Sequence, residues 1–151
     1  MAGTYSQIYM HLVFVVKYRQ AMIQQTWEDA LYKYISGVIQ KREQTLIAIN
    51  GMSDHVHLLI GMRPSCCLSD LVREIKKASN YYITEYRLTD KRFEWQSGFA
   101  AFSHSRRELD SVIRYIANQK SHHRVSSFRE EYVSLLKEFE VEYKEEYLFD
   151  I

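Results

Sequence analysis

The sequence predicts an α+β domain with a ferredoxin-like βαββαβ antiparallel sheet, followed by two additional C-terminal helices. Three observations support this prediction. Short runs of β-branched and aromatic residues alternate with segments of helical periodicity, capping signals precede the last two helices, and no repeat or Pro/Gly-rich linker divides the chain. A chain of 151 residues fits one domain, which we expect to span residues 1–151, with a C-terminal helix and acidic tail over about 128–151.

The first half of the chain is predicted to form a strand, a helix and a hairpin. Residues 6–16 (SQIYMHLVFVV) are continuously apolar or aromatic, which is typical of a covered central strand. Thr26 is a plausible N-cap for an amphipathic helix that extends to about Lys41. Residues 45–49 form the next expected strand, and Asn50-Gly51 is a strong turn signal before the strand that contains His55 and His57.

The second half is predicted to form a helix, a strand and two further helices. Apolar residues recur at helical spacing from Leu68 to about Leu88, and residues 93–103 (FEWQSGFAAFS) are expected to form the last strand. Two capping signals then start a third helix at Ser105 and a fourth at Ser127. In this order of elements the first and third strands are central, and one face of the sheet is free of the first two helices.

The charge distribution is uneven although the net charge is only +1, with 20 Lys and Arg against 19 Asp and Glu. Acidic residues dominate from Glu130 to Asp150, so the preceding part of the chain is basic. A basic body with an acidic tail is compatible with a polyanionic partner without demanding one. The near-neutral total excludes a general basic signature of nucleic-acid binding.

Cysteine usage and apolar segments indicate a cytoplasmic protein. Cys66 and Cys67 are neighbours, so they cannot build a disulfide framework and lack the paired spacing of a zinc site. The longest apolar run, residues 12–16, is far too short to span a bilayer, and the N-terminus carries no signal-like segment. We therefore expect a cytoplasmic location and no membrane association.

His55 and His57 form a candidate half-site for a metal ion. Because side chains of a strand alternate between faces, the two imidazoles point the same way, about 7 Å apart along the strand. At this spacing both imidazoles can coordinate one cation. The alternative interpretation, two histidines satisfied by hydrogen bonds on the sheet surface, has even weight on this evidence alone.

Tyr115 and Gln119 could complete such a site from the third helix. They are four residues apart, so they stack on one helical face at the edge of the apolar stripe. The amide oxygen of Gln119 is a possible third metal ligand, with a phenol one turn away. The alternative is a half-buried packing tyrosine and a surface amide.

These motifs resemble those of the HUH single-tyrosine transposases of small bacterial insertion sequences, the IS200-like transposases. The resemblance rests on His55-Val56-His57, which stands as histidine, hydrophobic, histidine, and on Tyr115-Ile116-Ala117-Asn118-Gln119. The strand-like segments 8–19 and 93–103 are also similar to the first and last strands of that family, so the resemblance covers nearly the whole chain.

The resemblance implies a DNA strand-cleaving and strand-joining enzyme. Tyr115 would attack single-stranded DNA and form a covalent 5′-phosphotyrosine intermediate, and His55, His57 and Gln119 would hold Mg²⁺ or Mn²⁺. The implied partners are single-stranded DNA with a hairpin at the ends of the element and a second copy of the chain in a homodimer. No nucleotide cofactor is expected, since no phosphate-binding glycine loop is present.

Several cations and histidines are secondary candidates. Lys17 and Arg19 lie at the end of the first strand, and Arg73, Lys76 and Lys77 lie on the polar face of the second helix, where they could contact DNA phosphates or form a solvated surface. Three histidines outside the HVH strand are not expected to bind the metal. His11 is expected to pack on the sheet unless it lies beside the pair, and His122 and His123 are expected to offset a helix dipole and meet DNA phosphate.

Two rival functions fit the same elements. A non-catalytic single-stranded nucleic-acid-binding module can use this sheet, although the basic-glycine-aromatic signature of RNA-recognition folds is absent. A metal-dependent phosphodiester hydrolase would use the same histidines with Tyr115 in a structural role, and it would release a free 5′-phosphate.

Overall fold

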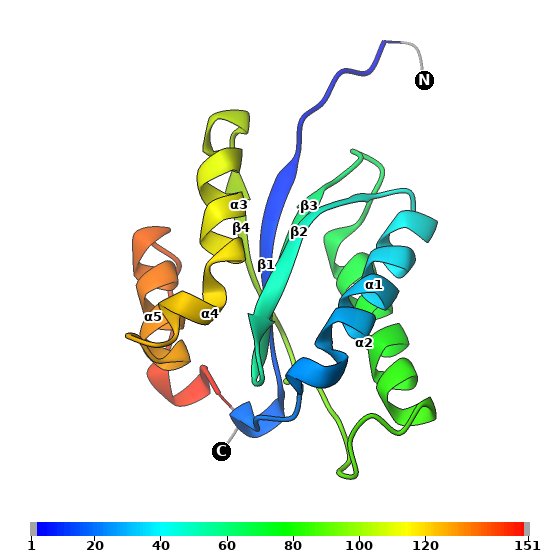
Figure 1. Ribbon diagram of the computed structural model, residues 1–151. Helices are drawn as coiled ribbons and strands as arrows, with labels where there is room; N and C mark the ends of the chain where they lie inside the picture. The colour runs from blue at the N-terminus through cyan, green and yellow to red at the C-terminus, as the bar shows by residue number, and fades with distance from the viewer. Residues whose placement is uncertain (1–2, 150–151) are drawn as a thin grey trace.

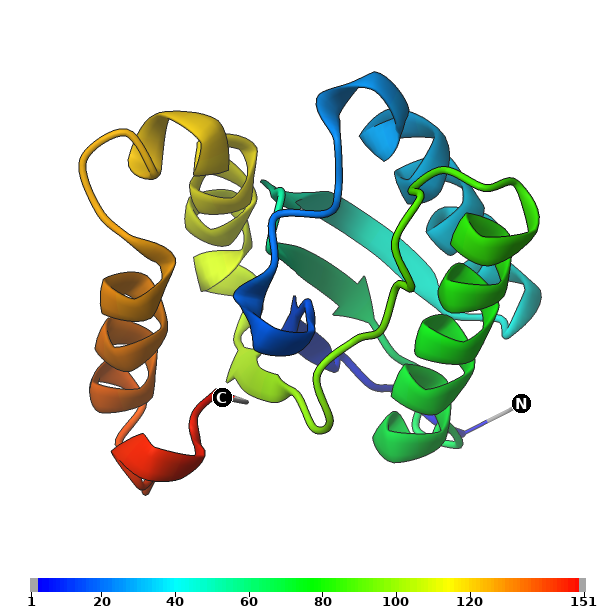
Figure 2. The same ribbon diagram turned by 90° about the horizontal axis from the view of Figure 1, so that it is seen from below.

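The structure is a computed structural model that describes residues 3–149, and its centre is a four-stranded antiparallel sheet with strand order β2-β3-β1-β4. The strands are β1 (Tyr9–Val15), β2 (Thr45–Met52), β3 (His55–Gly61) and β4 (Ala100–His104). The helices are α1 (Gln25–Lys41), α2 (Leu68–Glu85), α3 (Leu109–Ala117), α4 (Gln119–His122) and α5 (Phe128–Glu138). Helices α1 and α2 cover one face of the sheet, and α3, α4 and α5 lie on the other side (Figures 1 and 2).

The predicted fold class is confirmed. β1 and β3 are the two central strands and pair antiparallel along their whole length, from Tyr9 opposite Gly61 to Val15 opposite His55. The elements follow the order βαββαβ as far as β4, and the additional helices come after it. The third predicted helix is divided into α3 and α4 at Asn118, so three helices rather than two follow the sheet.

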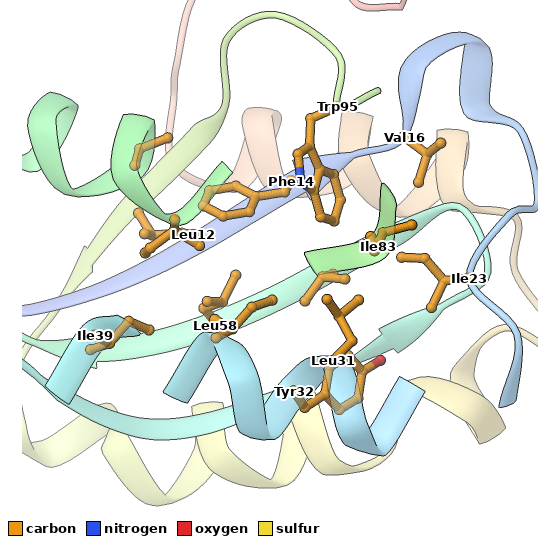
Figure 3. Close-up of a cluster of buried hydrophobic side chains, with 14 of the residues drawn as sticks. Leu12, Phe14, Val16, Ile23, Leu31, Tyr32, Ile39, Leu58, Ile83 and Trp95 are labelled. Carbon is orange, nitrogen blue, oxygen red and sulfur yellow. The ribbon is translucent and has the colours of Figure 1, made fainter. Parts of the chain in front are cut away.

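The main hydrophobic core lies between the sheet and helices α1 and α2 (Figure 3). Leu12 and Phe14 of β1 and Leu58 of β3 point to this side and have no exposed surface. Their spacing follows the two-residue period of a strand, which sends every second side chain to the same face. Burial of such large apolar side chains provides roughly 1.5–3 kcal/mol each and fixes the register of the central strands.

The opposite face of the sheet carries both apolar residues and the histidines. Val13 and Val15 of β1 and Phe102 of β4 pack against α5, while Leu59 of β3 packs against α3. His11, His55 and His57 share this face because they fall in the other half of the strand alternation. The added helices therefore bury a polar cluster between two apolar patches.

The hairpin of β2 and β3 is confirmed, but its turn lies three residues later than predicted. Asn50 and Gly51 belong to β2, opposite His57 and Val56, and the chain turns after Met52. A Cβ atom on Gly51 would stand 2.2 Å from the backbone oxygen of His55. Gly51 is needed for close backbone approach rather than for a turn conformation.

Other differences concern the ends of elements. The predicted strand 93–103 is shortened to β4, because Gly98 takes a left-handed φ of +80° and the segment before it makes only an isolated bridge between Trp95 and Val16. Helix α1 begins at Gln25 without a side-chain cap, so Thr26 is not its N-cap. The predicted caps Ser105 and Ser127 are confirmed, although Ser105 opens a short 3-10 turn, Arg106–Glu108, before α3.

None of the helices in the described part of the chain is both long and apolar enough to cross a membrane.

Candidate functional site

Three histidines of the central strands form the base of the candidate site. His55 and His57 are fully buried, and His11 of β1 is 2% exposed. His11 Nε2 lies 2.7 Å from His57 Nδ1, and their rings stack with centroids 5.0 Å apart. The condition set for His11 is therefore met, since it lies beside the pair rather than merely packing on the sheet.

The break between α3 and α4 brings Tyr115 and Gln119 onto this base. Asn50 donates hydrogen bonds from Nδ2 to the carbonyl oxygens of Ile116 and Ala117, which satisfies the open end of α3. The Tyr115 ring meets the His57 ring edge-on, with centroids 5.7 Å apart, and Gln119 is fully buried. The two side chains that the sequence singled out do approach the histidine pair.

Glu131 of α5 is the residue that joins the whole cluster. Its Oε2 accepts hydrogen bonds from the Tyr115 hydroxyl and from Gln119 Nε2, the latter at 2.7 Å. Its Oε1 lies 3.2 Å from His57 Nε2 and 2.9 Å from His123 Nε2. One buried carboxylate, 3% exposed, is thus within hydrogen-bonding distance of four side chains from β3, α3 and the α4 region.

Asp54 and Phe128 hold the His55 ring in its orientation. Asp54 Oδ1 lies 2.7 Å from His55 Nδ1, which directs His55 Nε2 into the cluster, 3.0 Å from Gln119 Oε1. The first residue of α5, Phe128, stacks on the His55 ring with centroids 3.9 Å apart. Histidines that bind metals are commonly held in this way, by a carboxylate on the nitrogen that does not face the metal.

Burial and hydrogen bonding set the protonation of the cluster. Burial lowers the pKa of His57 to about 4, although its hydrogen bond to Glu131 acts in the opposite direction. Burial also lowers the pKa of His11, helped by the neighbouring His57. Burial would raise the pKa of Glu131, but hydrogen bonds from His57, Tyr115 and Gln119 outweigh it and hold the pKa well below its usual value. Glu131 is therefore ionised at neutral pH.

The nucleophile candidate is held in its protonated form. Burial raises the pKa of Tyr115 above its ordinary value, and the hydrogen bond to the Glu131 carboxylate and its negative charge raise it further. A neutral phenol that donates to a carboxylate is a weak nucleophile, so attack needs either transfer of the proton to Glu131 or a cation that offsets the negative charge.

The donor chemistry fits a divalent metal ion. His55, His57 and Glu131 are all buried, and their ligand atoms lie within 4.8 Å of one another. A second group, His122, His123 and Glu131, meets the same spacing and shares the carboxylate. Imidazole nitrogens together with carboxylate and amide oxygens are ligands for Mn²⁺ and related divalent ions.

The sequence interpretation of His123 is wrong. Its side chain is 6% exposed, its Nε2 lies 3.1 Å from Gln119 Oε1, and its Nδ1 lies 3.0 Å from the Ser126 carbonyl oxygen. A side chain that is buried inside the cluster cannot meet DNA phosphate on the surface. His122 is more exposed, at 34%, and stands 3.6 Å from Glu131 Oε2.

Sequence reasoning missed Glu131, whereas it assigned His11 to packing on the sheet unless it lay beside the pair. Glu131 belongs to an acidic segment whose neighbours, such as Glu130, are exposed, so composition alone hides it. The available signal was position: Glu131 follows Phe128 by three residues, on the face of the helix that the apolar stripe buries. For His11, the signal was the predicted pairing of the first and third strands.

The predicted DNA-contacting cations are not equivalent. Lys17, Arg73, Lys76 and Lys77 line one cavity of about 630 Å³ between α2 and the segment before β4. Lys76 donates to the carbonyl oxygens of Gln96 and Gly98, and burial lowers its pKa to about 8, so it supports the loop. Arg19 lies apart from this cavity, over the ring of Phe149 at 4.4 Å.

A ferredoxin-like sheet that sets a His-hydrophobic-His strand against a tyrosine-bearing helix defines the structural class of this chain, and comparisons with known proteins give the same result. The family described as IS200-like transposase matches residues 4–119. The ISDra2 transposase TnpA of Deinococcus radiodurans is 25% identical over 122 residues, which cover 78% of this chain and 87% of that protein. The chain therefore belongs to the IS200-like transposase family.

Two solved structures agree with this fold. A protein of Deinococcus radiodurans R1 that is assigned as a transposase has a TM-score of 0.65 and 23% identity, covering 79% of this chain and 95% of that one. A REP-associated tyrosine transposase bound to a REP hairpin has a TM-score of 0.62 and 18% identity, covering 82% of this chain and 73% of that one. At these identities the likeness concerns the fold.

Proposed function

We propose that this transposase cleaves and rejoins single-stranded DNA at the ends of an insertion sequence through a covalent 5′-phosphotyrosine intermediate at Tyr115. The observation that carries the proposal is the direct contact of the Tyr115 hydroxyl with Glu131, which also contacts His57 and Gln119. A tyrosine with only a packing role has no need for a buried carboxylate that is shared with two histidines. The family membership of the chain supports the same chemistry.

The reaction forms one bond and breaks one. The Tyr115 oxygen attacks the phosphorus of a phosphodiester, the bond from phosphorus to the 3′ oxygen breaks, and that oxygen leaves as a 3′-hydroxyl after taking a proton. Glu131 is positioned to accept the phenol proton because it already accepts that hydrogen bond. Reversal of the same step by the 3′-hydroxyl of another strand rejoins the DNA.

His55, His57 and Gln119 are the proposed ligands of a divalent ion, Mg²⁺ or Mn²⁺. When bound, the ion supplies Lewis-acid polarisation of the phosphate and offsets the charge near Tyr115. His11 and Asp54 orient the two imidazoles from behind. Gln119 Nε2 is tied to Glu131, so its Oε1 faces the histidines as a ligand oxygen must.

The cavity beside α2 is the proposed contact surface for the DNA backbone. Arg73 and Lys77 are exposed on it and Lys17 is half-buried at its edge, so their charges can neutralise phosphates. Arg73 is paired with Asp70 at the surface, an interaction that competing phosphate can replace at little cost. Lys76 has a supporting role in this proposal, and Arg19 extends the basic surface outside the cavity.

A denaturing-gel assay tests the proposed function. Purified protein would be mixed with end-labelled single strands taken from the DNA that flanks its gene, with Mn²⁺ or Mg²⁺. The expected result is a protein-sized shift of the label that survives denaturation and is lost in Tyr115→Phe and His57→Ala. Cleavage that persists in Tyr115→Phe without an adduct indicates a hydrolase, and tight binding without cleavage indicates a binding module; either result contradicts the proposal.

A further inference from the structure

We propose that His123 is a third imidazole ligand of the divalent ion and Glu131 its anionic ligand, so that the C-terminal segment completes the metal site. The inference rests on the metal site of the proposed function. Both residues follow Gln119, the last residue of the segment that matches the family, so that match does not include them.

The proton of His55 is assigned by its neighbour. Nδ1 lies 2.7 Å from a carboxylate oxygen of Asp54, which can only accept, so Nδ1 carries the hydrogen. In the neutral ring Nε2 is then an acceptor. Yet Nε2 lies 3.0 Å from Gln119 Oε1 and 3.5 Å from Glu131 Oε1, two further acceptors.

His123 repeats this arrangement from the other side. Its Nδ1 lies 3.0 Å from the carbonyl oxygen of Ser126, so this nitrogen also carries the hydrogen. Its Nε2 lies 3.1 Å from Gln119 Oε1 and 2.9 Å from Glu131 Oε1. A second neutral imidazole therefore directs a lone pair at the same two oxygens.

The amide of Gln119 cannot relieve the conflict by rotating. Its Nε2 donates to Glu131 Oε2 at 2.7 Å, which fixes Oε1 toward the two histidines. Lone pairs of His55, His123, Gln119 and Glu131 consequently converge in a buried space. Only a shared cation, or a second proton on each imidazole, makes this arrangement favourable.

The distances from one carboxylate oxygen to three imidazole nitrogens are close to those between adjacent ligands of one ion. Three imidazole Nε2 atoms, those of His123, His57 and His55, lie 2.9, 3.2 and 3.5 Å from Glu131 Oε1. Donors that occupy adjacent octahedral positions about 2.1 Å from an ion lie about 3 Å apart. A site with three imidazoles and one carboxylate favours a first-row divalent ion such as Mn²⁺ over Mg²⁺, which prefers oxygen ligands.

The test measures metal binding rather than DNA cleavage. Titration calorimetry with Mn²⁺ would compare the wild-type protein, His123→Ala and Ser121→Ala, an exposed residue of the same turn. We expect His123→Ala to lower Mn²⁺ affinity at least about tenfold, while Ser121→Ala leaves it within about threefold of the wild type. Electron spin-echo spectroscopy of bound Mn²⁺ in the wild-type protein should count three coupled imidazole nitrogens.

The outcomes separate this inference from the function on which it rests. Two imidazole nitrogens on a tightly bound Mn²⁺, or equal affinity of His123→Ala and wild type, overturn the role of His123 and leave the proposed function intact. Absence of Mn²⁺ binding, or binding that His57→Ala leaves unchanged, overturns the metal site itself. Because the nitrogen count uses the wild-type protein, it remains decisive even if a variant folds poorly.

Discussion

Glu131 is the single residue on which the candidate site depends most. A buried carboxylate is costly unless its oxygens are hydrogen-bonded, and here both oxygens are occupied by Tyr115, Gln119 and two histidines. Glu131→Ala would leave these partners unsatisfied and cost about 3–5 kcal/mol of the free energy of unfolding. The same contacts that stabilise the ligand-free site also hold Tyr115 protonated, so stability and reactivity are opposed at this residue.

The buried histidines make stability depend on pH. Histidine has a pKa of about 6.5 in the unfolded chain, and burial lowers the pKa of His57 to about 4 in the folded protein. The folded state resists protonation, so this contribution to stability is complete above about pH 6.5 and is lost as the pH falls towards 4. Urea unfolding should show a decline of up to about 1.4 kcal/mol per pH unit for each such histidine.

His57→Gln is the comparison for this measurement, because glutamine cannot titrate. The variant should be less stable at pH 7 but should lose less stability than the wild type between pH 6.5 and 4.5. His11, whose pKa burial also lowers, contributes to the slope that remains. An identical slope in the variant would show that His57 is not the buried neutral group described above.

At this scale the sequence predicted the identity of several site residues but not their environment. The spacing of His55 and His57 follows from strand alternation, which any strand obeys. The burial of Glu131 depends on how α5 docks on the sheet, and that depends on apolar partners far away in the chain. Long-range packing of this kind leaves no local pattern around the carboxylate itself.

At the scale of elements, the close approach of β2 and β3 is the most sensitive feature. Gly51→Ala would put a methyl group 2.2 Å from the His55 backbone oxygen, so the hairpin must shift at the histidine strand. We expect a loss of about 1–3 kcal/mol. Gly37→Ala is the matched control, because the added Cβ meets nothing within 4 Å and α1 should gain about 0.5–1 kcal/mol. Thermal unfolding of both variants gives the comparison.

Equal and small effects of the two glycine substitutions would contradict this account of the hairpin.

The sequence predicted the hairpin correctly but placed the turn at Asn50-Gly51, because that dipeptide is a frequent turn signal. Pairing of Gly51 with Val56 overrides the local preference. The break of the third helix was missed for a similar reason, since it is stabilised by Asn50, a residue far away in the sequence.

At the scale of the whole molecule, the sheet separates the two surfaces to which we assign a function. The cluster of His55, His57 and Glu131 lies under α3, α4 and α5. The basic cavity lies beside α2. Arg73→Glu combined with Lys77→Glu should weaken binding of a hairpin with a single-stranded flank and reduce its salt dependence. Lys33→Glu combined with Lys41→Glu on α1, both outside this cavity, makes the same change in net charge and is the control. Unchanged affinity for the hairpin at moderate salt would show that this cavity does not contact the DNA.

The arrangement of subunits can be tested by mixing inactive variants. A homodimer is proposed from the family resemblance, and in this structure Tyr115 contacts the His57 ring of its own chain. If each site uses its own tyrosine, a mixture of Tyr115→Phe and His57→Ala remains inactive in the cleavage assay. Recovery of activity in the mixture would show that the tyrosine acts in the site of its partner.

The central claim is that Tyr115 becomes covalently joined to DNA. Trypsin cuts after Arg114 and Lys120, so the peptide Tyr115–Lys120 contains Tyr115 and no other tyrosine. Mass spectrometry of the denatured, nuclease-treated and trypsin-digested reaction would locate the linkage. The account predicts a nucleotidyl group on this peptide in the presence of a divalent ion. DNA with a free 5′-phosphate and an unmodified peptide, or a nucleotidyl group on another residue, would contradict it.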